Sequence, residues 1–107
     1  MRILLDECVN MRFRHEIPVH DVRTVDFMRW KSLQNGELLT AAAKQFDIFV
    51  TLDGNIPSQQ SLERFDIAVF VLKAKSNALA DLLPLVASLL EAAEASENGK
   101  TRLIEEA

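Results

Sequence analysis

Short apolar runs alternate along this chain with segments that favour helices, and this alternation is what most constrains the fold. Residues 67–72 form the clearest buried strand, and residues 2–5 and 47–52 are similar runs followed by acidic residues. Strands that alternate with helices pair in parallel, because each crossover places a helix on a face of the sheet. The sequence therefore predicts an α/β fold with a mostly parallel central sheet of four to five strands, covered on both faces.

Two longer segments have the composition of helices. Residues 37–46 are rich in Ala and Leu, with Asn35 as the expected N-cap and Glu37 in the first turn. In residues 77–94, apolar side chains recur every three or four positions, which predicts an amphipathic helix. Pro84 must lie in the first turns of that helix or kink it, because proline has no backbone N–H.

The remaining segments predict shorter elements. We expect a second strand at residues 20–26, where β-branched residues recur, and short helices at residues 9–16 and 58–65. Residues 101–104 favour a last strand. The tail after about residue 95 is therefore either an edge strand or partly disordered.

Composition and charge limit the classes of protein to which the chain can belong. Its 107 residues, 49% of them hydrophobic, suffice for the core of one domain spanning residues 1–107. No apolar run reaches the roughly 20 residues of a membrane span, and the start turns acidic too early for a signal peptide. We therefore expect a cytoplasmic protein with no membrane partner. A net charge of −4 and a pI near 5.1 argue against non-specific coating of nucleic acid, so an RNA-binding surface must be local.

Cysteine and histidine offer few sites for chemistry. Cys8 is the only cysteine, which excludes an internal disulfide and a zinc site built on several thiolates. Its side chain is either a nucleophile or, as we favour, a small apolar group that fills space after a strand. We interpret His15 and His20 as surface or capping residues.

Acidic residues follow two of the predicted strands and begin one predicted helix. Asp6 follows the first strand and Asp53 the third, while Glu37 starts the helix that leads into the third strand. All three can meet at the carboxyl edge of a parallel sheet, where ligands of such folds bind. Converging carboxylates repel one another, so they need a cation, and Mg²⁺ or Mn²⁺ suits oxygen ligands. Asn55 can add a neutral oxygen ligand. The alternative is that these acids are ordinary helix caps.

Four segments, in this order and spacing, resemble a known group of proteins. They are Leu4-Leu5-Asp6-Glu7-Cys8-Val9, Asn35-Gly36-Glu37-Leu38-Leu39, Val50-Thr51-Leu52-Asp53-Gly54-Asn55-Ile56-Pro57 and Ile67-Ala68-Val69-Phe70-Val71-Leu72-Lys73-Ala74-Lys75-Ser76-Asn77. Over residues 1 to about 93, the chain resembles the small bacterial PIN-like proteins of unknown function. These are relatives of the PIN ribonucleases that act as toxins in toxin–antitoxin pairs.

The resemblance implies a three-layer α/β/α fold and a divalent-metal nuclease site. It assigns metal-ligand and catalytic roles to Asp6, Glu37 and Asp53. Asn55 stands near a position where many PIN relatives carry another acid, which leaves the site one charge short. We rank Glu7 below these residues, because a strand period of two would point it to the opposite face from Asp6.

Basic and aromatic side chains supply candidates for contacts with RNA. Trp30 is suited to stack on a base, or else packs against a neighbouring loop or second subunit. The candidates for phosphate contacts are Arg12, Arg29, Lys31, Lys73 and Lys75. An ordinary mixed surface would have the same residues.

Three functions compete at this stage. The first is a metal-dependent ribonuclease for single-stranded RNA, with an antitoxin protein and a homodimer as further candidate partners. The second is a PIN-like binding module that has lost cleavage, which Asn55 and the acidic pI favour. The third is a phosphoacceptor receiver domain, in which Asp6, Glu7 and Asp53 would form the acidic pocket. A receiver also needs a lysine after its fifth strand, and no lysine closes residues 101–104.

Overall fold

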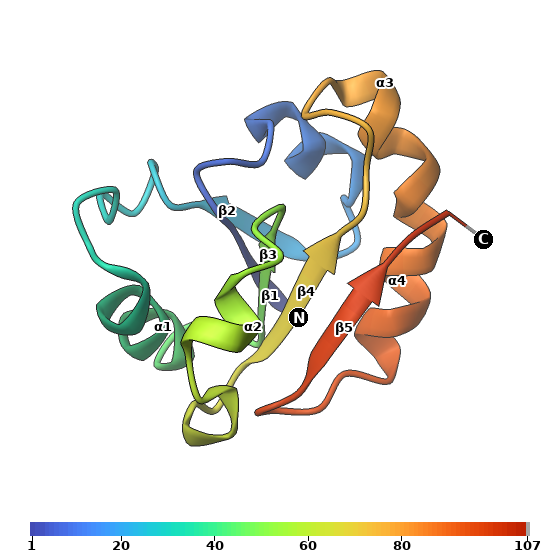
Figure 1. The fold of residues 1–107 in the computed structure, drawn as a ribbon. Coiled ribbons are helices and arrows are strands. Elements are labelled where there is room, and N and C mark those ends of the chain that lie inside the picture. The colour runs from blue at the N-terminus through green and yellow to red at the C-terminus, as the bar shows by residue number, and fades with distance from the viewer. Residues whose placement is uncertain (107) are drawn as a thin grey trace.

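A parallel β-sheet forms the centre of the protein in a computed structural model that describes residues 1–106 (Figure 1). Its five strands are β1 (Arg2–Leu5), β2 (Asp21–Thr24), β3 (Ile48–Thr51), β4 (Ala68–Leu72) and β5 (Thr101–Ile104). They pair in the order β2-β1-β3-β4-β5, and every pairing is parallel. The predicted α/β fold with a parallel sheet is therefore confirmed, and β5 is an edge strand.

Helices cover both faces of this sheet and give the three layers α/β/α. The helical elements, with η for a 3₁₀ helix, are η1 (Met11–Glu16), α1 (Asn35–Ala43), α2 (Ile56–Gln59), η2 (Leu62–Arg64), α3 (Leu79–Leu82), η3 (Leu83–Leu85) and α4 (Val86–Glu94). Side chains of η1, α3, η3 and α4 pack on one face, and those of α1, α2 and η2 pack on the other (Figure 1).

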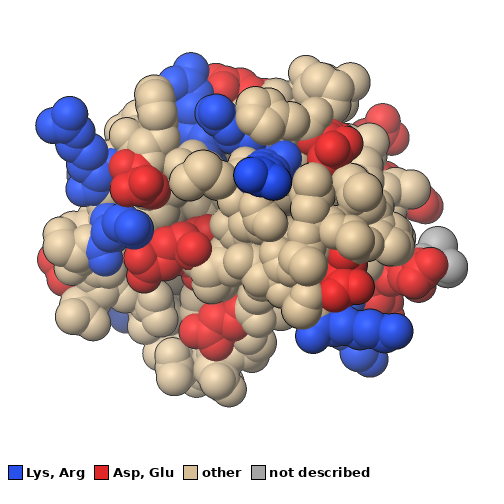
Figure 2. All heavy atoms as spheres, turned by 90° about the horizontal axis from the view of Figure 1, so that it is seen from above, with Lys and Arg blue, Asp and Glu red and all other residues tan. Residues whose placement is uncertain are grey.

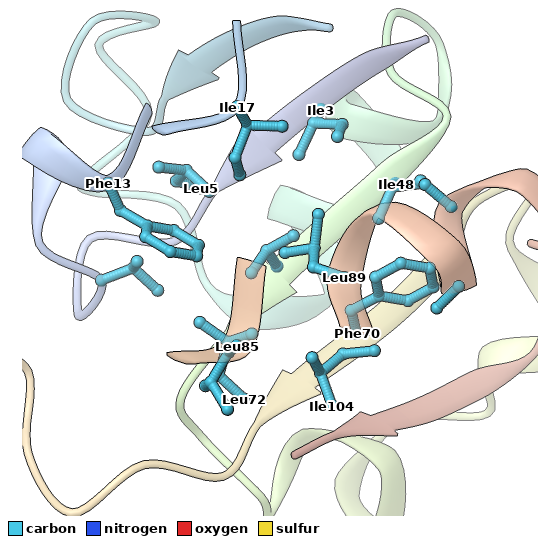
Figure 3. Close-up of a cluster of buried hydrophobic side chains, with 14 of the residues drawn as sticks. Ile3, Leu5, Phe13, Ile17, Ile48, Phe70, Leu72, Leu85, Leu89 and Ile104 are labelled. Carbon is cyan, nitrogen blue, oxygen red and sulfur yellow. The ribbon is translucent and has the colours of Figure 1, made fainter. Parts of the chain in front are cut away.

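The alternation of side chains along each strand divides the core between the two faces. In β1, Ile3 and Leu5 join the cluster on the α4 face, whereas Leu4 joins the cluster on the α1 face. Figure 3 shows the α4 face, where Phe70 of β4 and Leu89 of α4 converge on side chains from β1 and η1. Every residue of β4 is buried, which explains why its sequence is an unbroken apolar run.

Pro84 divides the long amphipathic segment into three pieces. Residues 77–94 were expected to form one helix that Pro84 begins or kinks, and the structure instead has α3, the 3₁₀ turn η3 around Pro84, and α4. Proline cannot donate the backbone hydrogen bond that an α-helix needs at this point. The longest helices, α1 and α4, have nine residues each, and no helix within residues 1–106 is long and apolar enough to cross a membrane.

The start of α1 differs from the prediction in one detail. Asn35 was expected to be the N-cap, but Asn35 is the first helical residue and Gln34 is the cap, without a side-chain hydrogen bond. The extended backbone of Gln34, with φ −71° and ψ 160°, sets the boundary. By contrast, the Asn10 side chain does cap η1 by accepting a hydrogen bond from the Arg12 backbone N–H.

Phe70 gives a direct test of the core on the α4 face. Its side chain is fully buried, so Phe70→Ala should lower the free energy of unfolding by about 3–5 kcal/mol through lost burial and a residual cavity. Leu103→Ala is the control, because Leu103 is 55% exposed on the edge strand and should change stability by less than about 1 kcal/mol. Urea unfolding followed by circular dichroism measures both, and equal losses for the two variants would contradict this core.

Candidate functional site

The order of the strands creates a crevice at the carboxyl edge of the sheet. From β1 the chain moves outward to β2, and it then returns to β3 on the other side of β1. The loops after β1 and β3 therefore leave in opposite directions, and ligands of open parallel sheets bind between such loops. Asp6 directly follows β1 and Asp53 lies two residues beyond β3. Figure 2 looks onto this edge, where acidic side chains lie close to Lys and Arg side chains.

Thr51, the last residue of β3, links the two acidic loops. Its hydroxyl donates a hydrogen bond to Asp6 Oδ2 over 2.7 Å and accepts one from the Asp53 backbone N–H over 3.0 Å. Thr51 is the one buried polar residue within residues 1–106, and a hydroxyl removed from water needs such partners. Thr51 was not among the predicted site residues. The available signal was a hydroxyl residue at the end of a strand that is otherwise fully apolar.

The two carboxylates keep free acceptor capacity. Besides the Thr51 hydroxyl, Asp6 accepts the Glu7 backbone N–H at Oδ1 over 2.8 Å and the Cys8 thiol at Oδ2 over 3.4 Å. Asp53 Oδ1 accepts the Asn55 backbone N–H over 2.9 Å. A carboxylate offers about four lone-pair sites, so Asp6 and Asp53 can each still bind a ligand.

Cys8 belongs to the same cluster as a protonated thiol. Its sulfur lies 3.5 Å from Thr51 Oγ1 and accepts the Leu52 backbone N–H over 3.4 Å. Partial burial of the sulfur raises the pKa of the thiol most. The hydrogen bonds with Thr51 and Leu52 lower it by less than burial raises it, and the Asp6 carboxylate raises it further. A raised pKa disfavours the thiolate that a nucleophile requires. Cys8 therefore supports the position of Asp6 instead of acting as a nucleophile.

A cavity of about 260 Å³ opens beside Asp6, between the loops that follow β1 and β2. We call it the Asp6 pocket; its lining includes Asp6, Glu7, Thr24, Asp26 and Lys31. Glu7 shares this pocket with Asp6, because β1 ends at Leu5 and the alternation of a strand does not continue into the loop. The expectation that Glu7 points to the opposite face therefore does not apply.

Glu37 takes no part in the hydrogen bonds around Thr51. It is exposed in the first turn of α1, and no hydrogen bond within residues 1–106 joins it to either residue. Within the same described residues, no three His, Cys, Asp or Glu side chains lie close enough together to hold a metal ion. The role of Glu37 as a third ligand stays a prediction.

The five predicted phosphate contacts are distributed around the carboxyl edge. Lys31 lines the Asp6 pocket, and its Nζ lies 3.8 Å from Asp26 Oδ1. Lys73 lines a second hollow with Leu52 and Gly54, and its Nζ is 3.6 Å from a Glu105 carboxylate oxygen. The other three candidates, Arg12, Arg29 and Lys75, are exposed.

Trp30 is half-buried against the core on the α1 face. Its ring meets Phe46 edge to face, with the centroids 6.2 Å apart and the planes at 83°. This agrees with the packing interpretation of Trp30. His20 fits its interpretation as a surface or capping residue, because its Nδ1 lies 3.2 Å from the Met1 amino nitrogen.

Comparison with known proteins does not identify a family for this chain. No family model, curated protein or solved structure matches the chain. Because a fold alone does not define a function, the function has to be argued from the Asp6 pocket and the residues around it.

The Thr51 bridge can be tested by a double-mutant cycle. Thr51→Val removes the hydrogen bond, and Asp6→Asn removes the negative charge that strengthens it, so their effects on the free energy of unfolding should be non-additive by about 0.5–3 kcal/mol. Asp66→Asn is the matched control, since Asp66 is exposed before β4 and should combine additively with Thr51→Val. Urea unfolding of the single and double variants provides the energies, and additivity with Asp6→Asn would argue against the bridge.

The protonation of Cys8 gives a separate prediction. Because the pKa of the thiol is raised, Cys8 should be alkylated by iodoacetamide at mildly alkaline pH several-fold more slowly in the folded protein than in urea. Its rate should still be rising at a pH where an unfolded cysteine has reached its plateau. Asp6→Asn should speed the reaction of the folded protein by removing the negative charge. Equal rates for the folded and unfolded protein would contradict the raised pKa.

Proposed function

We propose that this chain is a PIN-like ribonuclease domain that hydrolyses single-stranded RNA in the cytoplasm with the help of Mg²⁺ or Mn²⁺. The observation that supports it best is the Thr51-bridged pair of acids at the switch point of the sheet. Open parallel sheets bind their ligands at this point, and oxygen donors there favour hard divalent cations. The four segments that resemble PIN-like proteins supply the link to RNA.

The residues at the carboxyl edge of the sheet suit Mg²⁺, which keeps water ligands, better than an ion whose ligands all come from the protein. Mg²⁺ is usually held by one or two carboxylates together with water and substrate phosphates. Asp6 and Asp53 supply two carboxylates with free lone pairs, and the exposed Asn55 can add an amide oxygen. When bound, such an ion polarises the phosphodiester and favours in-line attack by water.

The chain's own residues have distinct roles under this proposal. Thr51 and Cys8 fix the Asp6 carboxylate by donating hydrogen bonds to the same oxygen. Lys31 places a positive charge in the Asp6 pocket, where it attracts a phosphate that would otherwise meet only acids. Lys73 does the same beside the Asp53 loop. Positioning of this kind is what a phosphoryl-transfer site mainly requires.

A catalytically weakened binding module is the second candidate. It is favoured by Asn55, which stands near a position of an acid in many PIN relatives, and by the absence, within residues 1–106, of three His, Cys, Asp or Glu side chains grouped closely enough to hold a metal ion. Under either candidate, an antitoxin protein and a second copy of the chain remain proposed partners.

The receiver alternative has one feature in its favour and one against. The strand order β2-β1-β3-β4-β5 also occurs in receiver domains, with the acids at the same edge. A receiver requires a lysine after its fifth strand, and Glu105 follows β5 here. Uptake of phosphate by Asp53 from a small phosphodonor would favour this alternative.

The nuclease proposal predicts cleavage of single-stranded RNA in Mn²⁺ that stops when EDTA is added. Asp6→Asn should lower the cleavage rate by at least about 100-fold, and Thr51→Val by about 10–100-fold, as expected for an outer-shell partner. Asp66→Asn, which removes the same charge at a distance from the site, should cleave normally. Cleavage that survives in Asp6→Asn at equal purity would refute the proposal.

Metal binding can be measured without activity. Mn²⁺ at about 100 times its dissociation constant should stabilise the folded protein by about 2.7 kcal/mol and raise the melting temperature. Asp6→Asn and Asp53→Asn should abolish this rise. Glu37→Gln then decides whether Glu37 also binds the ion. If Mn²⁺ raises the melting temperature of this variant by the same amount, Asp6 and Asp53 are the carboxylate ligands. If the increase is smaller, Glu37 is a ligand as well.

A further inference from the structure

Phe27 is an exposed aromatic side chain in the loop after β2, which contributes Asp26 and Lys31 to the lining of the Asp6 pocket. It lies three residues beyond the end of β2, and its backbone N–H donates a hydrogen bond to Thr24 Oγ1 over 3.0 Å. Thr24, the last residue of β2, lines the pocket as well. The Phe27 side chain is 59% exposed, and it is the one aromatic residue among the large exposed hydrophobics within residues 1–106.

Arg23 holds the Phe27 ring from one side. The Arg23 guanidinium carbon lies 5.0 Å from the ring centroid, within the range of a cation–π contact. Its Nε donates a hydrogen bond to Asp21 Oδ1 over 2.9 Å, so the guanidinium is itself anchored. Phe27 is therefore an exposed aromatic ring supported by a guanidinium group, and aromatic rings and Arg guanidinium groups are the side chains on which unpaired bases stack.

The surrounding loop combines this pair with positive charge. Arg29 and Lys31 follow Phe27 within four residues, and Lys31 lines the pocket. Arg29 has a φ of 62°, a left-handed conformation that is unfavourable for a residue with a side chain and that recurs at ligand sites. Trp30, in contrast, is turned inward against Phe46. Phe27 is thus the aromatic ring that this loop offers to a ligand.

We propose that Phe27, supported by Arg23, is a stacking platform for an unpaired base of single-stranded RNA, next to the Asp6 pocket. The inference rests on the proposed binding of RNA at this edge, but it does not require cleavage. Stacking accepts any base, because every base has a π-face, so the platform provides affinity without sequence readout. It selects single strands, since paired bases in a duplex are stacked on one another and their faces are covered.

The test measures RNA affinity in the Asp6→Asn background, so that cleavage does not interfere. Fluorescence anisotropy compares Phe27→Leu, which stays apolar but cannot stack, with Phe27→Trp, which keeps the stack. The probe is a short single-stranded RNA of mixed sequence, with an abasic oligonucleotide of equal length and a duplex of the same sequence as comparisons. Val19→Ala is the control for general surface hydrophobicity, because Val19 is an exposed hydrophobic residue ahead of β2, at the other end of that strand from the Asp6 pocket.

Phe27→Leu should weaken binding of the single strand by about five- to hundred-fold, and Phe27→Trp should retain it. Neither variant should change the weaker binding of the abasic strand, and Val19→Ala should bind like the parent Asp6→Asn protein. Unchanged affinity of Phe27→Leu, or an equal loss for the abasic strand, would overturn the platform. Phe27-dependent binding, together with absence of cleavage by the protein that keeps Asp6, would instead refute only the nuclease proposal.

Discussion

The candidate site depends on the two hydrogen bonds made by the Thr51 hydroxyl. This hydroxyl is buried at the end of β3, where it meets the Asp6 carboxylate on one side and the Asp53 backbone on the other. A hydrogen bond to a charged group is worth more than one between neutral groups, and leaving either partner unpaired carries a further penalty. The bond therefore fixes the relative position of two loops that come from distant parts of the chain.

The sheet provides the frame that makes this bridge possible. β1 and β3 are adjacent and parallel, and Leu5 pairs with Val50, so the residues that follow both strands emerge side by side. The backbone N–H of Asp6 continues the ladder by donating to the Val50 carbonyl over 2.8 Å. Apolar packing on both faces holds the strands in this register, because a slip by one residue would exchange the side chains of the two cores.

The Asp6 pocket combines charges of both signs but, like the protein as a whole, is acidic on balance. Asp6, Glu7 and Asp26 line one pocket, yet Lys31 lies in it as well. A purely acidic pocket would repel RNA, whereas a pocket that pairs acids with a lysine can hold a cation and a phosphate together. The exposed ring of Phe27 belongs to the same loop as Asp26 and Lys31. Under the proposed function, this edge of the sheet would hold the ion, the phosphate and the base.

The sequence by itself determined the layers and the strands of this protein. Unbroken apolar runs such as β4 predict strands buried on both faces, and the helical segments between them require parallel pairing. It also predicted that Asp6 and Asp53 each follow a strand and can meet at the carboxyl edge, since strand ends can be read from where the apolar run stops. These features are local, or follow from local patterns by simple rules.

Only the tertiary structure decided how the site is assembled. It made Thr51 the bridge, brought Glu7 into the pocket of Asp6, turned Trp30 inward and left Phe27 exposed. The orientation of such side chains depends on loops and on neighbours distant in sequence, and the periodicity of a strand ends where the loop begins. For the same reason, the place of Glu37 at the start of a helix could not show whether its carboxylate contacts the other acids. A position near an edge of the sheet does not fix the direction or the partners of a side chain.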